Sequence, residues 1–169
     1  ITASNPTFKE GETAAGVFSG AAVDVIESGQ AVQRLTFEVT NVSDGSAEVL
    51  VVDGSEVTLQ DGNSVSPTSG NSLTADVSVN SGTATVDVTG SFTEATANDV
   101  INNLAYKNTS DDPSAGSDRT VDLAEVQDNG GTSNGGNDTV GPTVASSTVS
   151  ITPVNDAPTV SVNTSDATF

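Results

Sequence analysis

The chain has 169 residues and a mass of 16.8 kDa, a length that suits one domain with linker ends and allows a substantial buried core. Its 4 basic and 23 acidic residues give a formal net charge of −19 at pH 7, which excludes binding to a nucleic-acid backbone or to an anionic membrane surface. Cysteine and histidine are absent, so disulfides, zinc–thiolate sites and the most frequent general base are excluded. We therefore expect a binding or structural module that is not an enzyme and does not insert into a membrane.

Alternating apolar and polar residues predict β-strands along most of the chain. Turns rich in Asp, Asn and Gly separate these strands, and Asn80-Ser81-Gly82 joins two of them into a hairpin. Many short strands with frequent turns predict an all-β fold, an antiparallel β-sandwich with Greek-key connections. In chain order, the predicted strands cover residues 22–26, 34–40, 48–52, 57–59, 75–79, 84–88, 120–126 and 144–151.

One segment, from Thr93 to Tyr106, departs from this alternation. Its apolar residues recur at helical spacing, Thr93 is a suitable N-cap, and Glu94 suits the first helical turn. We predict a single short helix that crosses between strands and closes one edge of the sandwich with its apolar face.

The two ends of the chain carry related sequences. Ser4-Asn5-Pro6-Thr7-Phe8 and Ser165-Asp166-Ala167-Thr168-Phe169 share the spacing of serine, threonine and phenylalanine. Such a repeat is typical of tandem modules. We therefore expect one module over residues 1–158, followed at 159–169 by a linker and the start of the next module.

Acidic and amide side chains gather in glycine-rich loops and near both ends of the chain. Oxygen ligands without histidine or cysteine are the set that a hard cation takes, and glycines allow backbone carbonyls to join them. We predict several calcium ions, because Ca²⁺ accepts irregular geometry with many protein ligands. The candidate metal ligands are Glu10, Glu12, Asp111, Asp112, Asp118, Asp128, Asn137, Asp138, Asn155 and Asp156.

Val154-Asn155-Asp156-Ala157-Pro158 resembles the boundary between cadherin-like tandem modules of giant bacterial RTX adhesins, and Glu10-Gly11-Glu12 resembles the acidic motif that opens such modules. Segments 104–113 and 118–121, together with the glycine-rich loop, resemble the calcium-dependent peptide-binding domain of ice-binding and Vibrio adhesins. The resemblance covers nearly the whole chain. It implies a cadherin-like sandwich that works outside the cell, at the bacterial surface.

The resemblance also implies capture of the C-terminal carboxylate of a peptide from another cell-surface protein through bound Ca²⁺. A cation is required physically, because a chain of this charge repels a carboxylate unless an ion inverts the local field. We expect the site in the loop Asp128–Asp138, with Asp111 and Asp112 close by and with Asn137 at a position where a carboxylate is expected. The candidate ligand-binding residues are Asp128, Gly130, Gly131, Asn134, Gly135, Gly136 and Asp138.

Two alternatives stay open. A purely structural extender would bind calcium at its junctions with neighbouring adhesin modules, through Asn155 and Asp156, and stiffen a stalk. The roughly 60 residues beyond the roughly 100 that a sandwich spacer needs favour a ligand site. A calcium-dependent lectin is disfavoured, because Tyr106 is the only tyrosine and tryptophan is absent. In all three interpretations we expect a monomeric module.

Overall fold

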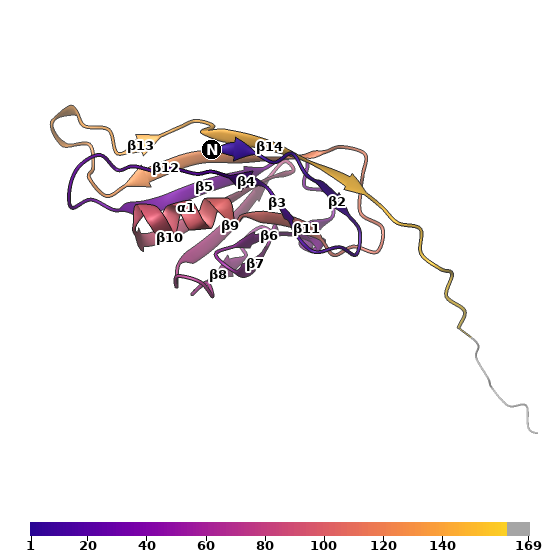
Figure 1. Ribbon diagram of the computed structural model, residues 1–169. Coiled ribbons are helices and arrows are strands. Elements are labelled where there is room, and N and C mark those ends of the chain that lie inside the picture. The colour runs from indigo at the N-terminus through magenta and orange to yellow at the C-terminus, as the bar shows by residue number, and fades with distance from the viewer. Residues whose placement is uncertain (162–169) are drawn as a thin grey trace, which may run out of the picture.

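The computed structural model describes residues 1–161 and shows two β-sheets packed against each other, with one helix at their side (Figure 1). Fifteen elements follow one another in the described chain. They are β1 (Thr2–Ala3), β2 (Thr7–Lys9), β3 (Ala15–Gly16), β4 (Phe18–Ser19), β5 (Val32–Val39), β6 (Glu48–Val52), β7 (Ser55–Thr58), β8 (Ser64–Val65), β9 (Thr74–Asn80), β10 (Thr83–Phe92), α1 (Glu94–Asn102), β11 (Ala105–Asn108), β12 (Arg119–Asp128), β13 (Thr139–Val140) and β14 (Ala145–Thr152), together with 3₁₀ turns at Gly45–Ala47 and Ser133–Gly135.

The larger sheet has the strand order β2-β14-β12-β5-β10-β9-β8, and β13 pairs with β12 beside β14. All pairs are antiparallel except β14 with β2. Successive side chains of a strand point to opposite faces, so every second residue of these strands enters the core. On β5 these residues include Leu35, Phe37 and Val39, all fully buried.

The smaller sheet has the order β3-β11-β6-β7, and β1 pairs with β4 as a separate ribbon. Its inward residues join those of the larger sheet in one hydrophobic cluster. Leu50 and Tyr106 are fully buried there, and the ring of Phe8 meets that of Tyr106 edge to face at 6.0 Å. Such an aromatic pair contributes about 0.5–1.5 kcal/mol beyond the area it buries.

The all-β sandwich with one helix is confirmed, and seven of the eight predicted strands are present. The helix begins after Thr93, whose hydroxyl accepts a hydrogen bond from the amide of Thr96 at 3.2 Å, as predicted for its N-cap. It ends at Asn102, earlier than predicted, because Tyr106 belongs to β11. The strand prediction for residues 22–26 is wrong, since this segment pairs with no strand.

Beyond β14 the chain continues away from the sandwich (Figure 1), and residues 153–161 form no regular element. Residues 162–169, which include most of the predicted linker and next module, lie outside the described residues. No helix in the described part of the chain is long and apolar enough to cross a membrane.

Candidate functional site

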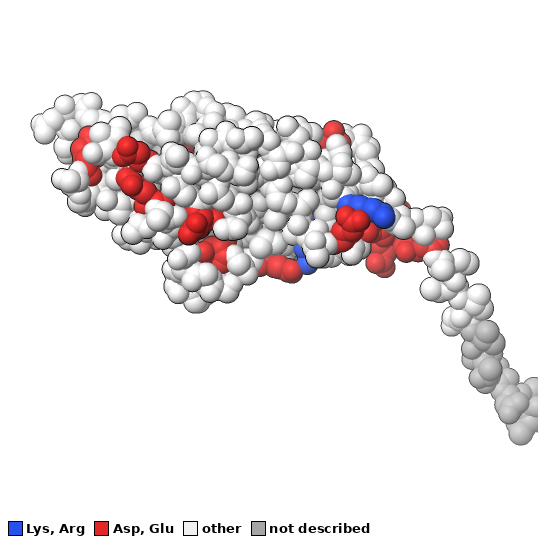
Figure 2. All heavy atoms as spheres, in the orientation of Figure 1, with Lys and Arg blue, Asp and Glu red and all other residues white. Residues whose placement is uncertain are grey.

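A groove of about 390 Å³ lies between segment 22–27 and the residues that flank the turn from β12 to β13. Carboxylates line it on both sides, and Asn137 adds an amide. Figure 2 shows acidic side chains along the left end of the molecule, the end where β13 lies in Figure 1, without a basic side chain among them. The carboxylates of the groove are Asp24 and Glu27 on one side and Asp128 and Asp138 on the other.

Exposed apolar side chains gather in the same groove. Within residues 1–161, six large apolar side chains are exposed, and four of them line it. These are Ile1, Ile26, Val140 and Val144, exposed by 43%, 85%, 56% and 37%. Single exposed apolar residues are ordinary, whereas a group of them rimmed by polar residues marks a binding surface. The groove therefore combines acidic and exposed apolar side chains.

The wall that contains segment 22–27 is bound by helix α1. The helix takes the position that a neighbouring strand would have in a sheet. Three side chains spaced four residues apart on the helix accept hydrogen bonds from alternate amides of segment 21–25. Four helical residues rise about 6.0 Å and two extended residues rise about 6.6 Å, so the two spacings match. The pairs are Ala21 N with Asn102 Oδ1 at 2.8 Å, Val23 N with Asn98 Oδ1 at 2.8 Å, and Val25 N with Glu94 Oε1 at 2.9 Å.

The intervening amides of this wall are open. Within residues 1–161, the amides of Ala22 and Asp24 take part in no hydrogen bond, and both residues line the groove. The wall ends at Ile26, whose φ of 64° lies in the left-handed region and whose amide donates to Asp24 Oδ1 at 2.8 Å. A β-branched residue in this region is a conformational outlier that costs about 1–3 kcal/mol. The strained turn keeps the Ile26 side chain in solvent at the rim.

The opposite wall belongs to the loop Asp128–Asp138. The two predicted metal ligands at its ends are hydrogen-bonded to each other and close the loop at its base. The amide of Asp128 donates to the carbonyl of Asp138 at 2.8 Å, and Asp128 Oδ1 accepts from the amide of Gly130 at 2.6 Å. Asp138 accepts from the Gln127 side chain at 3.2 Å and from the Thr139 hydroxyl at 3.1 Å. Each carboxylate is therefore held by local bonds that fix its direction.

The loop is also tied to the segment that leads into β5. Ala31 and Asn129 exchange two hydrogen bonds of 3.0 Å, one from the Ala31 amide to Asn129 Oδ1 and one from the Asn129 amide to the Ala31 carbonyl. The predicted ligand residues inside the loop shape its turn and are not among the residues that line the groove. They are Gly130, Gly131, Asn134, Gly135 and Gly136.

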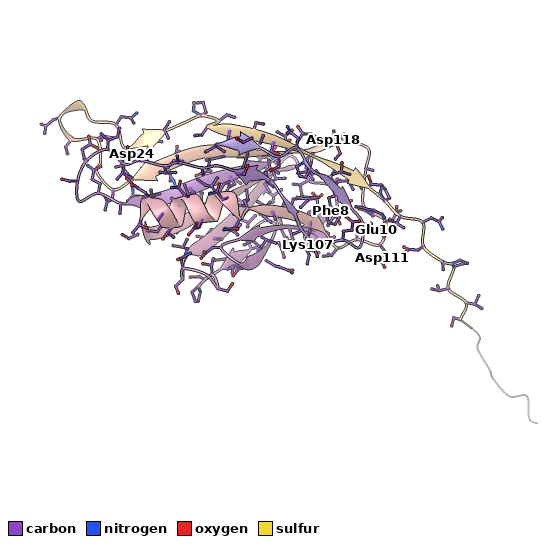
Figure 3. The ribbon with its side chains drawn as sticks, in the orientation of Figure 1. Phe8, Glu10, Asp24, Lys107, Asp111 and Asp118 are labelled. Carbon is purple, nitrogen blue, oxygen red and sulfur yellow. The ribbon has the colours of Figure 1, made fainter. Side chains whose placement is uncertain are left out.

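The remaining predicted metal ligands lie elsewhere. Figure 3 places Glu10 and Asp111 at the end of the sandwich opposite Asp24. The expectation that Asp111 and Asp112 lie beside the Asp128–Asp138 loop is therefore wrong. Glu10 instead meets the segment that leaves β14, since its Oε2 accepts from the amide of Val154 at 2.7 Å.

The other members of this set make contacts that do not bring them to the groove. Glu12 faces Lys9 at 3.9 Å, the backbone carbonyl of Asp118 accepts from Asn41, and the Asn155 side chain donates to the carbonyl of Asp156 at 3.0 Å. Across residues 1–161, no three acidic side chains are grouped closely enough to hold a metal ion. The side-chain oxygens around the groove are nevertheless those of carboxylates, one amide and the Thr139 hydroxyl, and the carboxylate and amide oxygens fit Ca²⁺ by type.

A buried ion pair explains where the loop from residue 109 to 118 lies. Arg119 is 1% exposed and Glu48 is fully buried. The guanidinium donates twice to the Glu48 carboxylate, at 2.8 and 3.0 Å, and also to the carbonyls of Ser114 and Ser117 at 3.1 and 2.7 Å. Arg119 thus fixes this loop against β6, at the end of the sandwich away from the groove.

This pair shifts the pKa of its own carboxyl group and of a neighbouring tyrosine. Burial alone would raise the pKa of Glu48, but hydrogen bonds from Arg119 and from the amides of Asp44 and Ser43 outweigh it and hold the pKa below its usual value. Burial and the Glu48 carboxylate raise the pKa of Tyr106, whose hydroxyl donates to Glu48 at 2.7 Å. Sequence reasoning missed the pair, although Arg119 shares the inward parity of Val121 on β12.

The comparisons with known proteins add no relative. No protein-family model matches the chain, and neither the curated proteins nor the solved structures contain a significant match. The function is therefore inferred from the groove and its chemistry.

Proposed function

We propose that this chain is a calcium-dependent binding module of a bacterial surface adhesin, which works outside the cell and captures the C-terminal end of a partner peptide. The observation that carries the proposal is the groove in which Asp24, Asp128 and Asp138 meet exposed Ile26 and Val140. A groove of this composition suits an extended peptide that offers backbone, apolar side chains and a terminal carboxylate.

The carboxylates explain the need for calcium. Asp128 and Asp138 on one wall and Asp24 on the other repel a carboxylate ligand in the absence of a cation. Bound Ca²⁺ would supply positive charge and coordination positions for the ligand carboxylate. Asp128, Asn137 and Asp138 are the residues that would hold the ion, and the apolar rim would contact the peptide side chains.

Calorimetric titration of the full chain with a library of free-acid peptides, in calcium and in chelator, tests the proposal. We expect binding only in calcium, and loss of binding when the peptide terminus is amidated. Asp138→Asn should weaken binding by about 100-fold, the effect of removing one partner of a desolvated charge contact. Glu56→Gln is the matched control, because Glu56 is 61% exposed on β7, outside the groove, and the substitution removes the same charge.

Two results would overturn the proposal. One is equal affinity for amidated and free-acid peptides, and the other is a lack of binding by every peptide in saturating calcium.

The extender function is a second candidate, supported by contacts at the opposite end of the sandwich. Glu10 donates its amide to the carbonyl of Thr152 at 3.0 Å and accepts from Val154, so an acidic motif lies where the chain leaves β14. A calcium ion at this junction would stiffen the exit segment. Small-angle scattering of two copies joined in tandem should then show lengthening in calcium, and unchanged dimensions would contradict this function.

The lectin alternative requires an exposed aromatic ring on which a sugar can stack. Tyr106 is fully buried and its hydroxyl is bound to Glu48, so this ring cannot stack on a sugar. Within residues 1–161 the phenylalanines are buried as well, at positions Phe8, Phe18, Phe37 and Phe92.

A further inference from the structure

Segment 21–25, which lines the groove from Ala22 onward, has the properties of an unpaired strand edge. Alternate amides are bound by helix α1, and those of Ala22 and Asp24 are free to pair with an added strand. An extended segment added to such an edge gains backbone hydrogen bonds, while pockets for its alternate side chains select its sequence. The exposed residues Ile26, Val140 and Ile1 form the apolar surface that would receive those side chains.

The repeat at the chain ends indicates which segment would add to this strand edge. Residues 162–169 align with residues 1–8 without a gap, and the shared positions have structural roles in the first copy. Phe8 is 1% exposed in the core, and the amide of Ser4 donates to the carbonyl of Val17 at 2.9 Å. In this register Val162 corresponds to Ile1.

The same register places Val160 two residues before the equivalent of Ile1. Side chains two residues apart in an extended chain lie on the same side, about 6.6 Å apart. Because Ile1 lines the groove, Val160 of a preceding copy would face the groove as well. Within its own copy Val160 is 84% exposed, and its segment leaves at the end of the sandwich opposite β13 (Figure 1), so it cannot reach its own groove.

We propose that the groove of one copy is the docking site for residues 157–161 of a preceding copy joined in tandem, with Val160 as the apolar anchor. The segment Ala-Pro-Thr-Val-Ser carries no charge, so it enters the acidic groove without the repulsion that a carboxylate ligand meets. Its backbone pairs with the open amides of Ala22 and Asp24, and Val160 packs near Ile26 and Val140. Pro158 favours the extended conformation that this pairing requires.

Docking of the preceding copy's segment would regulate peptide binding in the groove. This consequence rests on the proposed function. A peptide and the preceding segment would compete for the same wall, so a module with a docked predecessor binds peptide more weakly than a module without one. The open groove then belongs to copies that lack a docked predecessor.

The test is the full chain extended at its N-terminus by residues 157–161, with Ile1 following the added serine. Hydrogen exchange of the Ala22 and Asp24 amides should slow by about tenfold or more in the extended chain, since both amides are solvent-exposed donors without it. The matched control carries Val160→Ser within the added segment, which keeps length and charge and should restore fast exchange.

Unchanged exchange of both amides in the extended chain would overturn the proposal, and so would equal protection by the control. The same two chains are then titrated in calcium with the free-acid peptide library. Protection of the amides without any peptide binding would leave docking in place and refute the proposed function. Peptide binding of equal strength in both chains, with fast exchange, would refute docking alone.

Discussion

Replacing Arg119 by methionine tests how the loop opposite the groove is fixed. In the folded chain the guanidinium makes its two bonds to Glu48 inside the protein, and it also donates to Ser43 Oγ at 3.0 Å. Arg119→Met fills a similar volume but leaves the Glu48 carboxylate buried without its cation. The carbonyls of Ser114 and Ser117 lose their donor in the same step.

The expected loss of unfolding free energy is about 3–5 kcal/mol, because removing one partner of a buried pair strands the other charge in the interior. A domain of ordinary stability has about 5–15 kcal/mol, so this loss is a large part of the total. Arg34→Met is the matched control, since Arg34 pairs with Glu125 on the same sheet but both side chains are about one-third exposed. An exposed pair of this type contributes at most about 1 kcal/mol.

Urea unfolding followed by circular dichroism measures both variants against the parent chain. The double variant with Glu48→Gln should unfold at a higher urea concentration than Arg119→Met alone, because it no longer buries an unpaired charge. A loss below about 1 kcal/mol for Arg119→Met, or equal losses for the Arg119 and Arg34 variants, would refute this reasoning.

Three further predictions concern pH, metal and backbone. The folded-state pKa of Glu48 lies below its usual value, so its stabilisation is present above about pH 5 and disappears as the pH falls through that pKa; Glu48→Gln should flatten the acid limb of a stability profile. Millimolar calcium should raise the Tm clearly and magnesium only slightly, because Mg²⁺ resists dehydration, and equal Tm values in calcium and chelator would refute calcium binding. Gly141→Ala should cost about 1–3 kcal/mol in urea unfolding, since a Cβ there would lie 2.8 Å from the Ala124 carbonyl, whereas Gly116→Ala meets open space and should change little.

Alternation was enough to predict seven strands of the sandwich, because burial on one face is imposed by the packing of the two sheets. Within the predicted strand 34–40, Leu35, Phe37 and Val39 alternate with polar residues, and all three are buried. Of the residues predicted for the ligand loop, Asp128, Asn137 and Asp138 line the groove, whereas its glycines and Asn134 do not. Composition could identify this loop because acidic residues and glycines are concentrated within it.

The position of one loop relative to another could not be predicted in this way. Asp111 and Asp112 have the composition of a calcium loop, but their place is set by the bonds of Arg119 to Ser114 and Ser117. Those bonds depend on a partner, Glu48, that lies 71 residues away in the chain. Local sequence contains no signal for such a distance, so the two acidic loops were wrongly placed together.

Segment 22–26 has the alternation of a strand and pairs with no strand, because alternation reports which side chains are buried and not what binds the backbone. Ala21, Val23 and Val25 do pack against the core, as the pattern requires. Their amides are satisfied by Glu94, Asn98 and Asn102, polar residues repeated every four positions along one face of α1. That polar row, read together with the strand pattern, is the sequence signal of a helix that replaces a strand as a backbone partner. The side chains of α1 bind only one edge of the segment, so the other edge stays open toward the groove. The wrong strand prediction and the candidate site therefore have the same cause, a helix that replaces a strand as backbone partner.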